Sequence, residues 1–151
     1  MSRHGEALNG EFISFRVAGQ LLGIPVQMVQ EVLTAQRITR VPLAPPEVAG
    51  FLNLRGQIVT AVDLRARLDL KPREPGATVM NVVVQDEEEL FSLLVDEVGD
   101  VIEVSRDIFE EPPATLDERW RESCDGVYRL KEELLVAVNV PALLNVQRGR
   151  N

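Results

Sequence analysis

The sequence predicts a mainly β protein in which two small β-barrels pack together around a shared core, with only a few short helices. Three observations indicate this fold class. Short apolar stretches separated by turn residues recur along the chain, helical spacing is confined to brief segments, and the second half repeats the pattern of the first. With 151 residues, of which 45% are hydrophobic, the chain is long enough to form one domain with a sizeable core.

The first elements are expected to be a β-hairpin and a short helix. Residues 11–17 alternate so that one side of the strand is wholly apolar, and Gly19 signals the turn into a second strand, 21–24, which Pro25 closes. Residues 26–33 then place apolar side chains at helical spacing, which predicts one or two turns of helix. So short a helix is marginal unless it packs against the rest of the protein.

The middle of the chain is expected to alternate between strands and irregular connections. A strand runs into a connector over residues 36–50, where three prolines exclude a regular helix. Residues 57–64 form a strand, and Asp63 can cap the short helix 64–68 by accepting its free amide protons. Residues 77–85 are almost continuously apolar and β-branched, as expected of a central strand that is buried on both faces.

The chain also repeats itself, which indicates two similar barrels. Residues 50–68 align with residues 126–144 without a gap, and residues 21–33 align with residues 90–102 in the same order at nearly the same offset. The first alignment has six identical pairs, which are Gly50/Gly126, Leu54/Leu130, Ala61/Ala137, Val62/Val138, Ala66/Ala142 and Leu68/Leu144. Apolar strands resemble one another, so chance could explain either alignment alone, but the shared order favours a true repeat.

Two halves of about 70 residues therefore follow one plan. We expect a single domain over residues 11–146 with two barrel subdomains, approximately 11–70 and 71–146, and the repeat leaves open whether strands are exchanged between them. Each half is too small to be robust alone, so the two should share a core along their contact. Residues 1–10 and 147–151 are expected to be flexible tails.

Charge and apolar runs narrow the range of partners. The formal net charge of −8 argues against nucleic acid or an anionic membrane surface as the main partner. The chain lacks an apolar signal core at its start and a run of about 18 apolar residues, so we expect a cytoplasmic protein without direct membrane insertion.

Metal sites and disulfides are not expected. Cys124 is the only cysteine and His4 the only histidine, so an intrachain disulfide is excluded and a Cys/His metal site is hardly available. The acidic run 86–89 is interpreted as the solvated tip of a hairpin, because it lacks the ligand and glycine spacing of a calcium loop.

The small number of reactive side chains also argues against catalysis. We find no nucleophile–base pair, no phosphate-binding glycine loop and no metal cluster, so no cofactor is expected and no catalytic residue is assigned. The chain should neither hydrolyse ATP nor accept phosphate from a kinase. A small-ligand-binding barrel, or an enzyme that uses carboxylates alone, remains an alternative.

An arginine in the apolar stretch "GFLNLRGQIVTAVDL" needs an explanation. The hairpin of the first copy carries Arg55 followed by glycine, whereas the matching hairpin carries Lys131 followed by glutamate. An arginine presents five donors in a fixed fork, which suits recognition of a partner. Alternatively, Arg55 pairs with a carboxylate of its own chain, such as Asp63 or Glu31.

Three stretches resemble the CheW family, the coupling proteins of bacterial chemotaxis arrays. They are "GIPVQMVQEVL", "ITRVPLAPPEVAGFLNLRGQIVTAVDLRARL" and "LLVDEVGDVIEV", and the resemblance covers roughly residues 11 to 146. It implies two five-stranded barrels of the Src-homology-3-like type. It also implies a non-catalytic adaptor that joins the cytoplasmic tips of chemoreceptors to the regulatory domain of the histidine kinase CheA.

Together with the resemblance, the residues suggest how a receptor would bind. A receptor tip is a helical hairpin, and one of its helices could lie in an apolar groove between the two barrels. Val98 and Val101 would then offer apolar contacts, with Arg55 and Glu31 as polar flanks. Core packing is the alternative for both valines.

The resemblance also implies a kinase contact at Val29 and Gly50, where a glycine would allow two barrel surfaces to approach closely. Core packing or turn geometry is the alternative for these two residues. An adaptor of a related kinase pathway, such as one controlling pilus motility, would keep the fold and change the partners. In either pathway the protein would associate with membrane-bound receptor arrays only through its partners.

Overall fold

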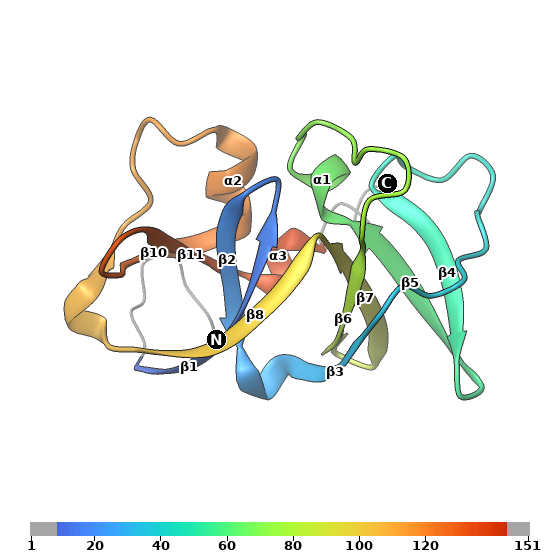
Figure 1. Cartoon of the computed structure of the whole chain (residues 1–151), viewed down its shortest axis with the longest axis horizontal. Helices are drawn as coiled ribbons and strands as arrows, with labels where there is room; N and C mark the ends of the chain where they lie inside the picture. The colour runs from blue at the N-terminus through green and yellow to red at the C-terminus, as the bar shows by residue number, and fades with distance from the viewer. Residues whose placement is uncertain (1–8, 145–151) are drawn as a thin grey trace.

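Two β-sheets lie side by side, and the computed structural model describes residues 9–144 (Figure 1). One sheet contains β1 (Gly10–Val17), β2 (Gln20–Pro25), β8 (Glu97–Val104), β9 (Phe109–Glu110), β10 (Cys124–Arg129) and β11 (Leu134–Val138). The other contains β3 (Val29–Leu33), β4 (Val48–Leu54), β5 (Gln57–Asp63), β6 (Met80–Asp86) and β7 (Glu89–Val95). The short helical turns are η1 (Val26–Met28), α1 (Leu64–Arg67), η2 (Arg106–Ile108), α2 (Glu118–Ser123) and α3 (Val140–Leu143).

The repeat found in the sequence is confirmed by the pairing of the strands. In the first copy Gly50 pairs with Ala61 beside a β-bulge, and in the second copy Gly126 pairs with Ala137 beside a bulge at the same place. Each of these hairpins leads into a one-turn helix, α1 or α3. The hairpins also pair in parallel with equivalent strands, because β5 lies beside β7 and β11 lies beside β2.

The two sheets exchange strands. The six-stranded sheet has the order β8-β1-β2-β11-β10-β9, and the five-stranded sheet has the order β3-β6-β7-β5-β4. Strand β3 follows β2 in the chain but pairs with β6, and β8 follows β7 but pairs with β1. Each sheet therefore takes strands from both halves of the sequence, and a boundary near residue 70 does not separate the sheets.

The sixth strand of the larger sheet also has an equivalent in the smaller one. Strand β9 has only two residues and pairs with β10, whereas Thr39 forms an isolated bridge to Phe51 of β4. Apart from these short edge pairings, each barrel has five strands, as the resemblance implied.

One expected helix is wrong. Residues 26–33 form the single 3-10 turn η1 and then strand β3, whose pairing with β6 supplies the backbone hydrogen bonds that a short helix would otherwise make. The strand expected within residues 36–50 is reduced to the Thr39 bridge and the start of β4, because proline lacks the amide hydrogen that a sheet needs. Gly10 begins β1, and residues 1–8 and 145–151 lie outside the described residues.

The predicted Asp63 cap and the predicted shared core are both confirmed. The Asp63 side chain accepts a hydrogen bond from the amide of Arg65 at 3.0 Å, and Asn139 caps α3 in the same way. The largest apolar cluster combines side chains of both sheets and both one-turn helices, including Phe15, Leu22, Leu64, Val82, Leu93 and Leu143. The prediction of two small barrels around a shared core is therefore confirmed.

A buried arginine also joins the two barrels. Arg67 of α1 donates from Nε to the carbonyl oxygen of Leu143 at 2.7 Å and from Nη2 to that of Ala142 at 3.3 Å. These acceptors lie at the carboxyl end of α3, where a positive charge is favoured. The side chain is buried, so the hydrogen bonds compensate for the loss of water around its charge.

Replacing Gly50 with alanine should destabilise the fold strongly. A β-carbon at this position would collide with the carbonyl oxygen of Thr39, and the backbone has a positive φ of +145°. We expect Gly50→Ala to lower the free energy of unfolding by about 2–4 kcal/mol, from steric overlap and backbone strain together. Urea unfolding followed by circular dichroism would measure it.

Gly76→Ala is the matched control, because Gly76 also has a positive φ but has open space where a β-carbon would lie. Strain alone should cost about 1 kcal/mol there. Equal losses in the two variants would contradict the close approach of Thr39 to Gly50.

Candidate functional site

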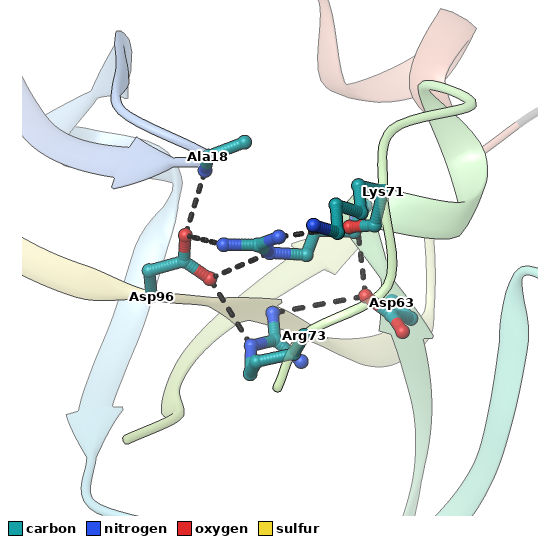
Figure 2. Close-up of polar contacts among 6 residues, drawn as sticks. Ala18, Asp63, Lys71, Arg73 and Asp96 are labelled. Atoms are coloured by element: carbon teal, nitrogen blue, oxygen red, sulfur yellow. Dashed lines mark hydrogen bonds and ion pairs between the residues drawn. The ribbon is translucent and has the colours of Figure 1, made fainter. Parts of the chain in front are cut away.

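A cluster of charged side chains lies where the two sheets meet (Figure 2). We call Asp63, Arg65, Arg73 and Asp96 the Asp96 cluster. Asp96 stands alone between β7 and β8, and its carboxylate accepts hydrogen bonds from Nε of Arg65 at 3.1 Å, from Nη2 of Arg65 at 2.7 Å and from Nε of Arg73 at 3.1 Å. The amide of Ala18, in the turn between β1 and β2, donates a further bond of 2.6 Å to it.

The Asp96 cluster is largely shielded from water. Its four side chains are between 15% and 30% exposed. Burial by itself raises the pKa of Asp96, but the hydrogen bonds from Arg65, Ala18 and Arg73 outweigh burial and hold this pKa below its usual value. Asp96 is therefore ionised at neutral pH, and the pKa of Arg65 is raised by its hydrogen bond to the same carboxylate.

The described residues contain neither a cluster of metal-ligating side chains nor an accessible thiol. Within residues 9–144, no group of three or more His, Cys, Asp and Glu side chains is placed to hold a metal ion, and no helix is long and apolar enough to cross a membrane. Cys124 is buried, and burial is the main cause that raises the pKa of its thiol to about 11. The thiol is therefore protonated at neutral pH and is a poor nucleophile. His4 lies outside the described residues.

Arg55 and Gly56 form the two-residue turn between β4 and β5. Both have a positive φ, +52° and +90°, which is the requirement of a type I′ hairpin turn. The side chain of Asn53 accepts a hydrogen bond of 2.9 Å from the amide of Gly56. A β-carbon at Gly56 would meet nothing within 4 Å, so turn conformation rather than a close approach accounts for this glycine.

The side chain of Arg55 pairs with Glu31, which was one of the two carboxylates considered. Nη1 of Arg55 donates to Oε2 of Glu31 at 3.1 Å, and Nη2 donates to Oε1, so the two side chains form a fork. The hydrogen bond lowers the pKa of Glu31. Because β3 and β4 are the outer strands of their sheet, this pair closes the barrel from one edge to the other.

Arg55 is nevertheless accessible to a partner. Its side chain is 70% exposed, whereas that of Glu31 is 25% exposed. Asp63, the other carboxylate considered, belongs to the Asp96 cluster instead. The two alternatives for Arg55 are therefore compatible, because an exposed guanidinium that is already paired still presents part of its surface to solvent.

The two valines proposed for receptor contact lie on β8 of the six-stranded sheet. Val101 pairs with Ile13 of β1 and is 50% exposed, whereas Val98 is half-buried and packs against the main core. Val101 thus offers exposed apolar surface. The partial burial of Val98 is explained by its packing against the core. Arg55 and Glu31 come together on the other sheet, so the candidate receptor residues form two separate pairs.

The two residues proposed for kinase contact are less accessible. Val29 of β3 is half-buried against the main core, and Gly50 of β4 is buried. The close approach that requires glycine at position 50 is made by Thr39 of the same chain rather than by another protein. A kinase contact at Gly50 would therefore have to include the segment that covers it.

One exposed residue beside that segment was missed. Leu43 is fully exposed and has a positive φ of +65°, which is unusual for leucine. It lies between Pro42 and Pro45 in the loop that joins β3 to β4, where Val41 is also exposed. The stretch "VPLAPP" could have indicated it, because apolar residues between prolines have no sheet in which to bury themselves.

Comparisons with known proteins agree on one family. The family model described as CheW-like domain matches residues 11–148. The chain is 34% identical to the chemotaxis protein CheW of Rhizobium meliloti over 133 residues, covering 88% of this chain and 86% of that protein. It is 30% identical to protein PilI of Pseudomonas aeruginosa over 126 residues, covering 82% and 70%.

A solved structure has the same fold. The crystal structure of the scaffolding protein TtCheW from Thermoanaerobacter tengcongensis superposes with a TM-score of 0.82 at 26% identity. The match covers 92% of this chain and 94% of that one.

The Asp96 cluster predicts a loss of stability in acid. The folded-state pKa of Asp96 is lowered, so its ionised form stabilises the protein above the unfolded-state pKa of about 3.9, and this contribution is lost as the pH falls through the folded-state value. Melting temperatures measured from pH 6 to pH 2 should therefore fall at the acid end.

Asp96→Asn should have a lower melting temperature than the unchanged protein at neutral pH. Its melting temperature should also fall less on acidification. A residual loss is expected because the pKa values of Glu31 and Glu133 are also lowered by their arginine partners. An acid profile parallel to that of the unchanged protein would contradict this assignment.

Proposed function

The chain belongs to the CheW-like family, and from this premise we propose that it is a non-catalytic adaptor that couples chemoreceptor tips to the histidine kinase CheA. The observation that carries the proposal is the match of nearly the whole two-barrel fold to a scaffolding protein of chemotaxis type. An adaptor needs two separate binding surfaces rather than a reactive centre, and the two barrels offer distinct surfaces.

The receptor surface is proposed to include Arg55, Glu31, Val98 and Val101. The fork to Glu31 uses one hydrogen on each terminal nitrogen of Arg55. A guanidinium has five N–H donors, so donor hydrogens remain for a receptor side chain. Val101 supplies exposed apolar surface for a helix that lies between the barrels. Glu31 holds the arginine in one orientation, which lowers the entropy lost on binding.

The kinase surface is proposed to centre on the loop around Leu43. This loop continues directly from Thr39, which covers Gly50, and leads into β4. The prolines on either side restrict its backbone, so the exposed leucine is held ready to enter an apolar pocket of the kinase regulatory domain. Gly50 would then support this surface from beneath Thr39, whereas Val29, which packs against the main core, would belong to the kinase surface only if that surface extends to the start of β3.

An adaptor role in a related kinase pathway, such as one controlling pilus motility, is the second candidate because the chain also resembles protein PilI. In either pathway the protein would work in the cytoplasm and reach receptor arrays through its partners. Co-sedimentation with receptor fragments and CheA, compared with the corresponding partners of a pilus pathway, would separate the two. Failure to bind either set would contradict both.

Arg55→Ala should weaken receptor binding by about tenfold while the melting temperature stays close to that of the unchanged protein. An exposed ion pair contributes little to folding, whereas the loss of charged hydrogen bonds at an interface is costly. Arg55→Lys should recover only part of the affinity, because lysine keeps the charge but loses the fork. Titration with a receptor fragment, beside thermal unfolding, measures both quantities.

Arg129→Ala is the matched control, because Arg129 is 64% exposed and pairs with Glu110 on the other barrel. It should leave receptor affinity unchanged. If Arg55→Ala melts much earlier and loses receptor and kinase together, Arg55 is a structural residue instead.

Leu43→Asn should lower kinase affinity about tenfold, a change of about 1.4 kcal/mol, without loss of stability. Asparagine tolerates a positive φ better than leucine, so the variant should melt at the same temperature or slightly higher. Ile58→Thr, at another exposed aliphatic residue, should leave kinase affinity unchanged. Unchanged binding in Leu43→Asn would remove this loop from the kinase surface.

A further inference from the structure

We propose that Asp96 is a positioning residue that fixes the angle between the two barrels and so sets the place of β8 in the receptor surface. The second part of this inference rests on the proposed function, and the first part does not. The argument starts from the path of the chain, because few points along it can control how one barrel sits on the other.

Within residues 9–144 the chain passes from one sheet to the other at two places (Figure 1). The first crossing is η1, between β2 and β3, and the second is Asp96 itself, the single residue between β7 and β8. In the sequence repeat the equivalent of Asp96 is Gln27, an exposed residue of η1. Only the second crossing therefore carries a carboxylate.

Asp96 bonds to both barrels at once. Its carboxylate accepts a bond from Ala18 in the β1–β2 turn, and its own amide donates to the carbonyl oxygen of Arg16 at 2.9 Å, so both contacts reach the six-stranded sheet. On the other side, Arg65 belongs to α1, and Arg73, labelled in Figure 2, belongs to the connection between α1 and β6. Together α1 and this connection join β5 to β6 of the five-stranded sheet. These directional bonds restrain the crossing from two sides.

The negative charge of Asp96 is needed at the crossing as well as its hydrogen bonds. Nη2 of Arg73 is buried, donates no hydrogen bond among the described residues and lies 3.8 Å from Oδ1 of Asp63. Without the charge of Asp96, the partly buried guanidinium groups of Arg65 and Arg73 would keep only the weaker charge interactions with Asp63 and Glu74. Because an uncompensated charge is costly away from water, the barrels should then separate locally to admit solvent.

Strand β8 would be the element most affected. It begins directly after Asp96, with Val98 two residues and Val101 five residues further on. A change in the angle of the crossing would move both valines relative to Arg55 on the other barrel. A receptor helix that contacts both barrels needs that relative position to be fixed, so Asp96 acts on binding without touching the receptor.

The direct test is the distance between spin labels on the two barrels. Labels placed on cysteines at Glu11 of β1 and Gln85 of β6, both exposed strand residues, would report the distance by pulsed electron resonance. The unchanged protein should show one narrow distribution. Asp96→Asn should broaden or shift it, and Glu133→Gln, which removes the Arg16–Glu133 pair within the six-stranded sheet, should not.

If Asp96→Asn does not fold, Arg73→Met serves in its place, because it removes one of the donors and leaves the Arg65 fork. A distribution identical to that of the unchanged protein in the folded variant would overturn the inference. Receptor titration is the second readout. Asp96→Asn should lower the affinity for receptor about tenfold, and Glu133→Gln should leave it unchanged. If the unchanged protein fails to bind receptor, the proposed function fails while the distance measurement still decides the role of Asp96.

Discussion

The structure depends on the exchange of strands between its two sheets. A five-stranded barrel of about 70 residues buries only enough apolar surface to be marginally stable alone. By sending β3 into one sheet and β8 into the other, the chain makes each barrel incomplete without strands from both halves. The main apolar cluster follows from this exchange, because it combines side chains from both sheets and from α1 and α3. Folding of one barrel is therefore coupled to folding of the other.

Features that depend on local sequence could be predicted, and features that depend on distant partners could not. The repeat placed Gly50 and Gly126 at equivalent positions, and Asp63 was correctly placed as a helix cap. Residues 26–33 were assigned as helix because helical spacing was present, but the pairing with β6 comes from a segment about fifty residues later. Arg55 could be matched to Glu31 or Asp63 only once the edges of the barrel were known.

The candidate site shows the same division. Three members of the Asp96 cluster lie within residues 63–73, but Asp96 follows Arg65 by 31 residues and accepts its backbone hydrogen bond from Ala18, 78 residues earlier, so no short window of sequence reveals the cluster. Leu43 did leave a local signal, but an exposed leucine has meaning only when the rest of the loop is known to lie outside the core. The repeat is compatible with the two proposed surfaces, since the copies share a backbone plan while Arg55 of one corresponds to Lys131 of the other.

Physical reasons favour an ionic rather than an apolar contact at the junction. An apolar cluster of the same volume could stabilise the interface as well or better, because a partly buried ion pair must first lose its water. Apolar contacts are nearly indifferent to small rotations, however, whereas the bonds from Arg65, Arg73 and Ala18 to Asp96 are lost when their angles change. In this protein the shared apolar core holds the barrels together, and the Asp96 cluster selects one orientation among those that the core would permit. An adaptor that must hold two partners in a fixed arrangement needs the second property as much as the first.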